Sequence, residues 1–249
     1  MTSVLFEESG KVGHIIFNRP EKLNAINDAL QKEVIGICEN LKERKDLSVI
    51  IVSGKGSSFM AGADLEVFAM FRDNPEGIKT FMQHGNKLAQ GLYSLPQYTI
   101  SAVEGSAVGG GYEFALYTNY IIAGKDAKFG LPETLLGLLP GLGGAHLLEK
   151  RIGAKGLKMA ITGEIISAEE AYKLGLIDEI SESKTSLEKA FQLADQIIKN
   201  PTFTTHILKK HFLHFNPLNI ETVLNDFQHL LTEPESQKRI QAFLSRIKE

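Results

Sequence analysis

The segment Gly105-Ser-Ala-Val-Gly-Gly-Gly-Tyr-Glu113 follows the apolar run of residues 100–103 and leads into another apolar stretch at residues 112–117. A buried strand, a glycine turn and a buried helix are the simplest interpretation of this order. The first N–H groups of such a helix have no intrahelical acceptor and carry a partial positive charge. Since glycines let a ligand approach that backbone closely, the turn predicts a site for phosphate or for a developing oxyanion.

A second segment, Ala61-Gly-Ala-Asp64, predicts the same local geometry. It is a turn of small residues, and Leu65, Phe68 and Phe71 follow it at helical spacing. Two helix N-termini could therefore direct two N–H donors at one oxygen, which is the minimum for holding a thioester enolate. Four apolar side chains fit either a helix core or an acyl-tail pocket: Phe68, Phe71, Phe81 and Met82.

Neither glycine segment fits a nucleotide-binding motif. The chain has no G-x-G-x-x-G after a predicted strand and no G-x-x-x-x-G-K-[ST] loop. It also lacks a G-x-S-x-G nucleophile elbow, which argues against an α/β-hydrolase.

Two glutamates are the candidate catalytic residues. Glu113 lies three residues after Gly110, one helical turn away, and Glu133 follows Pro132. A carboxylate buried behind glycines is costly unless it is paired or takes part in the chemistry. Two such carboxylates, each beside a backbone kink, could form an acid/base pair.

Composition excludes several other classes. The 249 residues carry 27 Lys and Arg against 30 Asp and Glu, a net charge of −3, so we expect no nucleic-acid partner. The single cysteine, Cys38, excludes an intramolecular disulfide and a cysteine-only zinc site. His206, His211 and His214 lie on one predicted helix, with His211 and His214 three residues apart, but no third metal ligand can be placed, so we expect no metal. With no run of 18 apolar residues and no leader pattern at the start, we expect no membrane association and a cytoplasmic location.

Hydrophobic periodicity favours an α/β fold with βα-type connections. Apolar runs predict strands at residues 14–17, 47–52, 100–103 and 120–123. Apolar residues recur at helical spacing over residues 30–41, between the first two of these runs. From about residue 186 onward the apolar residues follow helical spacing throughout. We therefore expect a mixed core over residues 1–190 and a helical C-terminal region over residues 191–249.

Six segments, in order along nearly the whole chain, resemble the enoyl-CoA hydratase/isomerase (crotonase) family. They are NRPEKLNAIN (18–27), AGAD (61–64), GGGYE (109–113), PE with LGLLPGLGG (132–144), TGEIISAEEA (162–171) and GLID (175–178). The resemblance implies a crotonase-like α/β fold, a spiral of ββα units followed by a helical C-terminal region. It also implies an acyl-CoA substrate and self-association through residues 191–249 as a trimer or a pair of trimers.

The resemblance also implies roles for individual residues. The thioester carbonyl would be held by the backbone N–H groups of Ala63 and Gly110, and Gly141 would help to hold the reactive water. Glu113 would orient and activate that water, and Glu133 would deliver a proton to Cα. The coenzyme A path would be lined by Ala25, Ala61, Asp64 and Leu65, with Phe243 and Arg246 contributed by the neighbouring subunit.

The leading interpretation is a 2-enoyl-CoA hydratase that needs no cofactor, with the acyl-CoA thioester as its substrate. Glutamate at both positions 113 and 133 matches hydratases of the resembled family. Because one fold hosts several reactions, another lyase or an isomerase of this family stays open. A catalytically idle CoA-binding protein is the alternative from a different class.

Overall fold

The computed structural model describes residues 2–70, 74–214, 234 and 238. Within these residues the chain forms a six-stranded sheet in the order β1-β2-β3-β4-β6-β9. Its strands are β1 (Val4–Ser9), β2 (Val12–Phe17), β3 (Val49–Gly54), β4 (Tyr98–Val103), β6 (Tyr120–Gly124) and β9 (Glu179–Ser181). Only the β1–β2 pair is antiparallel in this sheet, and the other neighbours run parallel. The predicted α/β class and the four predicted strands are confirmed, although β2 and β4 begin two residues earlier, and β3 two residues later, than expected.

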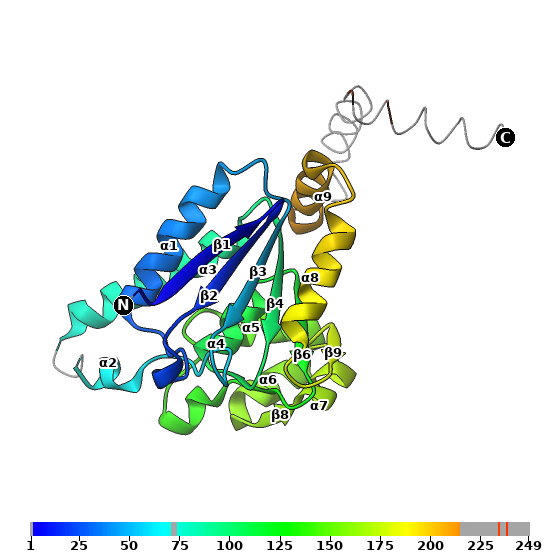
Figure 1. The fold of residues 1–249 in the computed structure, drawn as a ribbon. Helices are drawn as coiled ribbons and strands as arrows, with labels where there is room; N and C mark the ends of the chain where they lie inside the picture. Colours follow the sequence, from blue (N-terminus) through cyan, green and yellow to red (C-terminus); the bar gives the residue numbers. More distant parts are fainter. Residues whose placement is uncertain (1, 71–73, 215–233, 235–237, 239–249) are drawn as a thin grey trace.

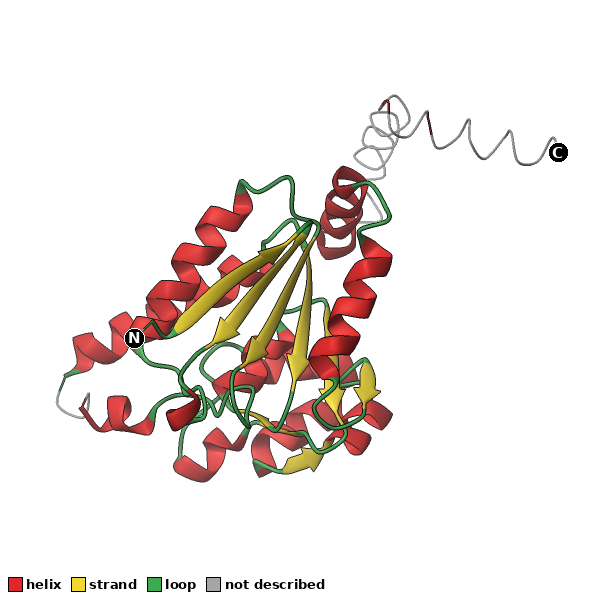
Figure 2. Ribbon diagram, in the orientation of Figure 1, coloured by secondary structure: helices red, strands yellow, loops and turns green. Residues whose placement is uncertain are grey.

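Helices cover both faces of this sheet (Figures 1 and 2). Because side chains alternate along a strand, Ile50 and Val52 of β3 join one hydrophobic cluster, while Val49 and Ile51 join another. The first cluster includes the apolar stripe of α1 (Asp28–Lys42) and residues of α3 (Pro75–Tyr93). The second is covered by α8 (Ser186–Ile197), whose Ala190 and Ala194 are buried. The continuous apolar run in β3 thus reflects burial on both faces.

A smaller three-stranded sheet and several short helices complete the described fold. This sheet has the order β5-β7-β8 and comprises β5 (Ser106–Val108), β7 (Lys128–Gly130) and β8 (Ile165–Ser167). The remaining helices are α2 (Leu65–Met70), α4 (Gly110–Leu116), α5 (Gly144–Ile152), α6 (Ala154–Thr162), α7 (Ala168–Leu174) and α9 (Thr202–His214). Two 3-10 turns are η1 (Pro20–Lys22) and η2 (Pro132–Leu136).

The carboxyl ends of the parallel strands gather the segments singled out in the sequence. β2 leads through η1 to Ile26, β3 leads to the turn before α2, and β4 leads through β5 to α4. Isolated bridges join these connections, pairing Ile26 with Ala63 and Met60 with Ala107. In open α/β sheets, ligands bind outside the carboxyl ends of the strands. The topology therefore brings both glycine segments to one edge.

The C-terminal region is only partly described. The expected boundary at residues 190/191 falls inside α8, and a second helix, α9, follows Pro201. Beyond residue 214 only residues 234 and 238 are described, so Phe243 and Arg246 lie outside the described residues. No helix in the described part of the chain is long and apolar enough to cross a membrane.

Candidate active site

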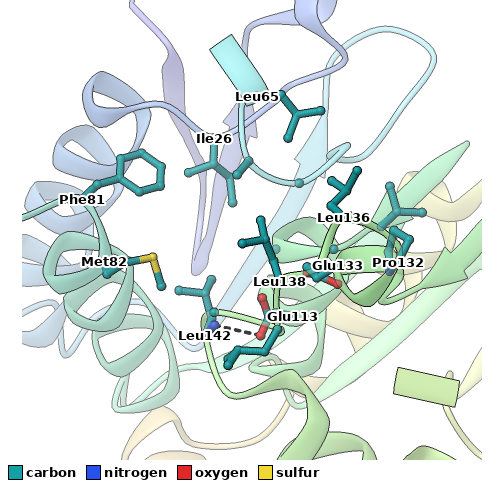
Figure 3. A pocket seen from close by; sticks show the side chains of 18 of the residues that line it. Ile26, Leu65, Phe81, Met82, Glu113, Pro132, Glu133, Leu136, Leu138 and Leu142 are labelled. Atoms are coloured by element: carbon teal, nitrogen blue, oxygen red, sulfur yellow. Dashed lines mark hydrogen bonds between the residues drawn. The ribbon is translucent and has the colours of Figure 1, made fainter. Parts of the chain in front are cut away.

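A cavity of about 760 Å³ opens between α2, α3, α4 and η2. Its wall is mainly apolar side chains and glycine backbone (Figure 3). The apolar side chains include Ile26, Leu65, Ile78, Phe81, Met82, Val108, Leu136, Leu138, Leu139 and Leu142. The polar contribution is small and consists of Gln31, Glu113, Glu133 and the backbone of the two glycine segments. A mostly apolar concavity with a few convergent polar groups is typical of a small-molecule site.

The glycine turn brings two backbone N–H groups together in the wall. Gly109 has φ 54° and ψ −135°, a conformation that glycine adopts readily, and Gly110 then begins α4. As the first helical residue, Gly110 has no intrahelical acceptor for its N–H. A Cβ atom on Gly110 would lie 3.9 Å from the nitrogen of Ala63, which places the two predicted donors side by side. Both residues line the cavity.

Glu113 is the more deeply buried acid, with 1% of its surface exposed. It lies in the first turn of α4, and its Oε1 accepts hydrogen bonds from Leu142 N at 2.8 Å and Gly144 N at 2.7 Å. The pKa of Glu113 is raised to about 7, mainly by burial and to a smaller extent by the charge of Glu133, against the opposing effect of the N–H groups of Gly144, Leu142 and Gly141. Such a pKa suits an acid/base group that works near neutral pH.

Glu133 approaches the same glycine turn from η2. A Cβ atom on Gly109 would lie 3.0 Å from Glu133 Oε1, whereas one on Gly110 would lie 3.9 Å from Glu113 Oε2. Burial also raises the pKa of Glu133, and its Oε2 is buried without a hydrogen-bond partner among the described residues. Figure 3 shows both carboxylates in the cavity. The structure thus brings together two acids that are twenty residues apart in the chain.

The loop before α5 holds Glu113 and shapes the cavity. Gly141 lines the cavity, and a Cβ atom there would meet Met82 Cε at 2.6 Å. The hydroxyl of Tyr117 donates a hydrogen bond to the carbonyl oxygen of Leu142, the residue whose N–H binds Glu113. Tyr117 therefore fixes the orientation of this loop, a contribution that no feature of the sequence indicated.

The residues expected along the coenzyme A path divide into two groups. Ala61 and Leu65 line the cavity, and Leu65 is 58% exposed at its margin. Ala25 and Asp64 are buried beside it. Arg19 Nη2 donates to Asp64 Oδ2 at 3.1 Å, and Arg19 Nη1 donates to the carbonyl oxygen of Ala25. Among the described residues, these two contacts of Arg19 stabilise the turn before α2.

Sequence reasoning missed part of the wall. Of the four apolar candidates, Phe81 and Met82 line the cavity, whereas the side chain of Phe68 and all of Phe71 lie outside what the structure describes. Gln31 and Gly85 were not anticipated. A polar residue within the apolar stripe of α1 was the available signal for Gln31.

Comparisons with known proteins identify the family of this chain. The family model for "Enoyl-CoA hydratase/isomerase" matches residues 7–249. The chain is 33% identical over 226 residues to a short-chain-enoyl-CoA hydratase of Clostridium acetobutylicum, covering 90% of this chain and 86% of that protein. It is 30% identical to a 2,3-dehydroadipyl-CoA hydratase of Escherichia coli, covering 99% and 97% of the two chains. The crystal structure of an enoyl-CoA hydratase from Bacillus anthracis matches with a TM-score of 0.91 at 28% identity, covering 98% of this chain and 96% of that one. The chain has the crotonase fold and belongs to the enoyl-CoA hydratase/isomerase family.

Proposed function

We propose that this protein adds water reversibly to 2-trans-enoyl-CoA thioesters to give 3-hydroxyacyl-CoA. The observation that carries the proposal is a buried carboxylate and a half-buried one, both with raised pKa values, which share one cavity with two adjacent backbone N–H groups. Relatives named enoyl-CoA hydratase, which cover most of the chain, support hydration over the other reactions of the family.

In the proposed reaction, the thioester oxygen accepts hydrogen bonds from the N–H groups of Ala63 and Gly110. The oxygen of water forms a bond to Cβ while Glu113 takes a proton from that water. The π electrons move toward the thioester oxygen as an enolate, which the two N–H groups stabilise. Glu133 then delivers a proton to Cα, so the net change is the syn addition of one water, without oxidation or reduction. Glu113 is left protonated and Glu133 ionised, and proton exchange with solvent after product release restores both acids.

The division of roles follows from what each acid contacts. Glu113 Oε1 is committed to two backbone N–H groups, so Oε2 is the oxygen that can face a water near Gly110. Gly141 would help to hold that water, since it lines the cavity next to Glu113. Glu133 has an unpartnered buried oxygen among the described residues, which suits a group that exchanges a proton with substrate. The proposed reaction requires no cofactor.

Coenzyme A would follow the open side of the cavity along Ala61 and Leu65, with Ala25 and Asp64 shaping the turn beneath it. We assign Phe243 and Arg246 of a neighbouring subunit to the far end of coenzyme A. The proposed assembly is a trimer or a pair of trimers. An exposed apolar patch on η2, α6 and β8 supports it, because large exposed apolar patches mark interaction sites. The patch comprises Leu135, Leu157, Ile161 and Ile165.

Incubation with crotonyl-CoA tests the function directly. We expect loss of the conjugated thioester absorbance and a product heavier by one water, identified by mass spectrometry as 3-hydroxybutyryl-CoA. A product of unchanged mass with a shifted double bond would assign the protein to the isomerases instead. Binding of crotonyl-CoA without turnover would support the idle CoA-binding alternative.

Sedimentation tests the assembly. Three or six copies of the 27.4-kDa chain would have a mass of about 82 or 164 kDa. Ile161 is 63% exposed in the patch, so Ile161→Glu should shift the population toward monomer. Tyr172→Glu, at a 52% exposed position on α7 outside both the patch and residues 191–249, is the matched control. A wild-type monomer that is fully active at assay concentrations would contradict both the assembly and the shared coenzyme A site.

A further inference from the structure

One polar side chain in the cavity has no role in the proposed reaction. Gln31 lies on α1 within a buried apolar stripe and is 2% exposed, yet it lines the cavity. Its Oε1 has no hydrogen-bond partner among the described residues. Leaving a buried polar atom without a partner costs about 1–3 kcal/mol, so such an atom normally has a ligand or a structural partner.

Gln31 lies in the same part of the cavity wall as Leu142. A Cβ atom on Gly85 would lie 2.7 Å from Leu142 Cδ2 and 3.4 Å from Gln31 Nε2, so the Gln31 amide and the Leu142 side chain meet beside Gly85. The N–H of Leu142 binds Glu113. The Gln31 amide therefore lies close to the residue that holds Glu113, on the part of the wall that α1 and α3 form. Because the proposed function assigns Leu65 to the coenzyme A path, we take this part of the wall as the acyl side.

Apolar side chains line the same part of the wall as the amide. Phe81 and Met82 of α3 line the cavity beside Leu142, as Figure 3 shows. A plain alkyl chain would fill this space but would leave Gln31 Oε1 without a partner. A group that donates a hydrogen bond to that oxygen would satisfy it.

The charges of the lining side chains limit which chemical group can donate a hydrogen bond to Gln31 Oε1. Among the described lining residues, the ionisable side chains are Glu113 and Glu133, and no lysine or arginine contributes. A carboxylate at the end of the acyl chain would therefore be buried without a cation, at a high free-energy cost. A hydroxyl is neutral and can donate to the amide oxygen while accepting from the amide nitrogen.

We infer that Gln31 is a specificity-determining residue that hydrogen-bonds a hydroxyl on the distal part of the acyl chain. The preferred substrates are accordingly 2-enoyl-CoA thioesters that carry a distal hydroxyl. This inference rests on the proposed hydration of enoyl-CoA, because the acyl chain must enter the cavity past Glu113 and Glu133.

The test compares terminally hydroxylated and unsubstituted hexenoyl-, octenoyl- and decenoyl-CoA, matched in length, by kcat/KM. At the length that reaches Gln31, wild-type enzyme should favour the hydroxylated member by about tenfold or more. Gln31→Met keeps the side-chain length and removes the amide, so the preference should disappear or reverse. Since both members of each pair are measured with the same enzyme preparation, their ratio is insensitive to the fraction of active protein.

Gln97 provides the matched control. Its Oε1 is also buried without a partner among the described residues, but Gln97 does not line the cavity, and its Nε2 donates to the carbonyls of Leu41 and Arg44. Gln97→Met should lower Tm and leave the substrate ratio unchanged. Gln31→Met should keep or raise Tm, because it removes an unsatisfied polar group rather than a bonded one.

The possible failures are distinguishable. If wild-type enzyme hydrates crotonyl-CoA and the longer substrates but Gln31→Met leaves every hydroxylated-to-unsubstituted ratio unchanged, the inference about Gln31 is overturned and the hydratase function stands. A fall in Tm for Gln31→Met with an unchanged ratio would assign the amide a structural role and would also overturn it. If no enoyl-CoA is hydrated, the proposed function and the inference fall together.

Discussion

Glu113 Oε1 accepts a hydrogen bond from the backbone N–H of Gly144 at 2.7 Å, which ties the first turn of α4 to the first residue of α5. The contact is tight, because a Cβ atom on Gly144 would lie 2.6 Å from Glu113 Cγ. One carboxylate oxygen is thus held by the protein backbone. The second is left for the substrate side of the cavity, and this asymmetry underlies the predictions that follow.

Glu133→Gln should lower kcat by ~10²–10⁴-fold, which is the usual contribution of a positioned acid/base group. The amide keeps the shape of the side chain but cannot deliver a proton to Cα. Steady-state hydration of crotonyl-CoA measures the loss, and circular dichroism checks that the fold is intact. Hydration near the wild-type rate would remove Glu133 from the mechanism.

The pH dependence of kcat/KM should show an acid limb near pH 7. Burial raises the pKa of Glu113 to about 7, and the group must be ionised to take a proton from water. Activity should therefore fall about tenfold per pH unit below that value. Because Glu133 lies close by and interacts with Glu113, the midpoint belongs to the pair of acids. A rate that is flat from pH 5 to pH 8 would contradict the role of Glu113 as the base.

The raised pKa of Glu113 also predicts a stability effect. The folded-state pKa of about 7 exceeds the unfolded value of 4.5, so the folded protein binds the proton more tightly. The contribution to stability is therefore fully present below pH 4.5 and is lost as the pH rises through 7. A shift of this size corresponds to ~3 kcal/mol.

Glu113→Gln should abolish that loss because the amide stays neutral at every pH. Urea denaturation at pH 5 and pH 8 measures the free energy of unfolding of both proteins. We expect the variant to gain stability relative to wild type as the pH rises from 5 to 7, with little further change to pH 8. An equal difference at both pH values would show that Glu113 titrates with an ordinary pKa.

Gly110→Pro tests whether the backbone N–H of Gly110 donates a hydrogen bond to the thioester oxygen. Proline is tolerated at the first position of a helix, where its missing N–H costs no intrahelical hydrogen bond. Removing one oxyanion donor should cost ~3–4 kcal/mol of transition-state stabilisation. Gly110→Ala is the control, since it retains the N–H and adds a Cβ that meets Ile26 Cδ1 at 3.0 Å. If the folded proline variant matches the alanine variant in kcat, Gly110 is not a donor.

Several local features were predictable because they depend on neighbours in the chain. The helical spacing of apolar residues over 30–41 predicted α1. The Ser167–Glu170 capping box at the start of α7 likewise has a local sequence signature, a serine followed three residues later by a glutamate. The prediction for the start of α4 was less accurate, since the helix begins at Gly110 rather than at Tyr112. The positive φ of Gly109 ends the preceding strand, so the two glycines that follow can enter the first helical turn.

The sequence by itself determined the α/β class and the glycine turns and indicated the two candidate acids, since periodicity, backbone freedom and residue type are local properties. Only the tertiary structure decided that Glu113 and Glu133 share one cavity, that Leu142 and Gly144 hold one of them, and that Gln31 reaches the same space from α1. These relationships join α1, α4, η2 and the loop before α5. Their physical cause is the parallel sheet, which brings the carboxyl ends of distant strands to one edge. There the carboxylate of Glu113 is buried and that of Glu133 half-buried, and the pKa values of both rise.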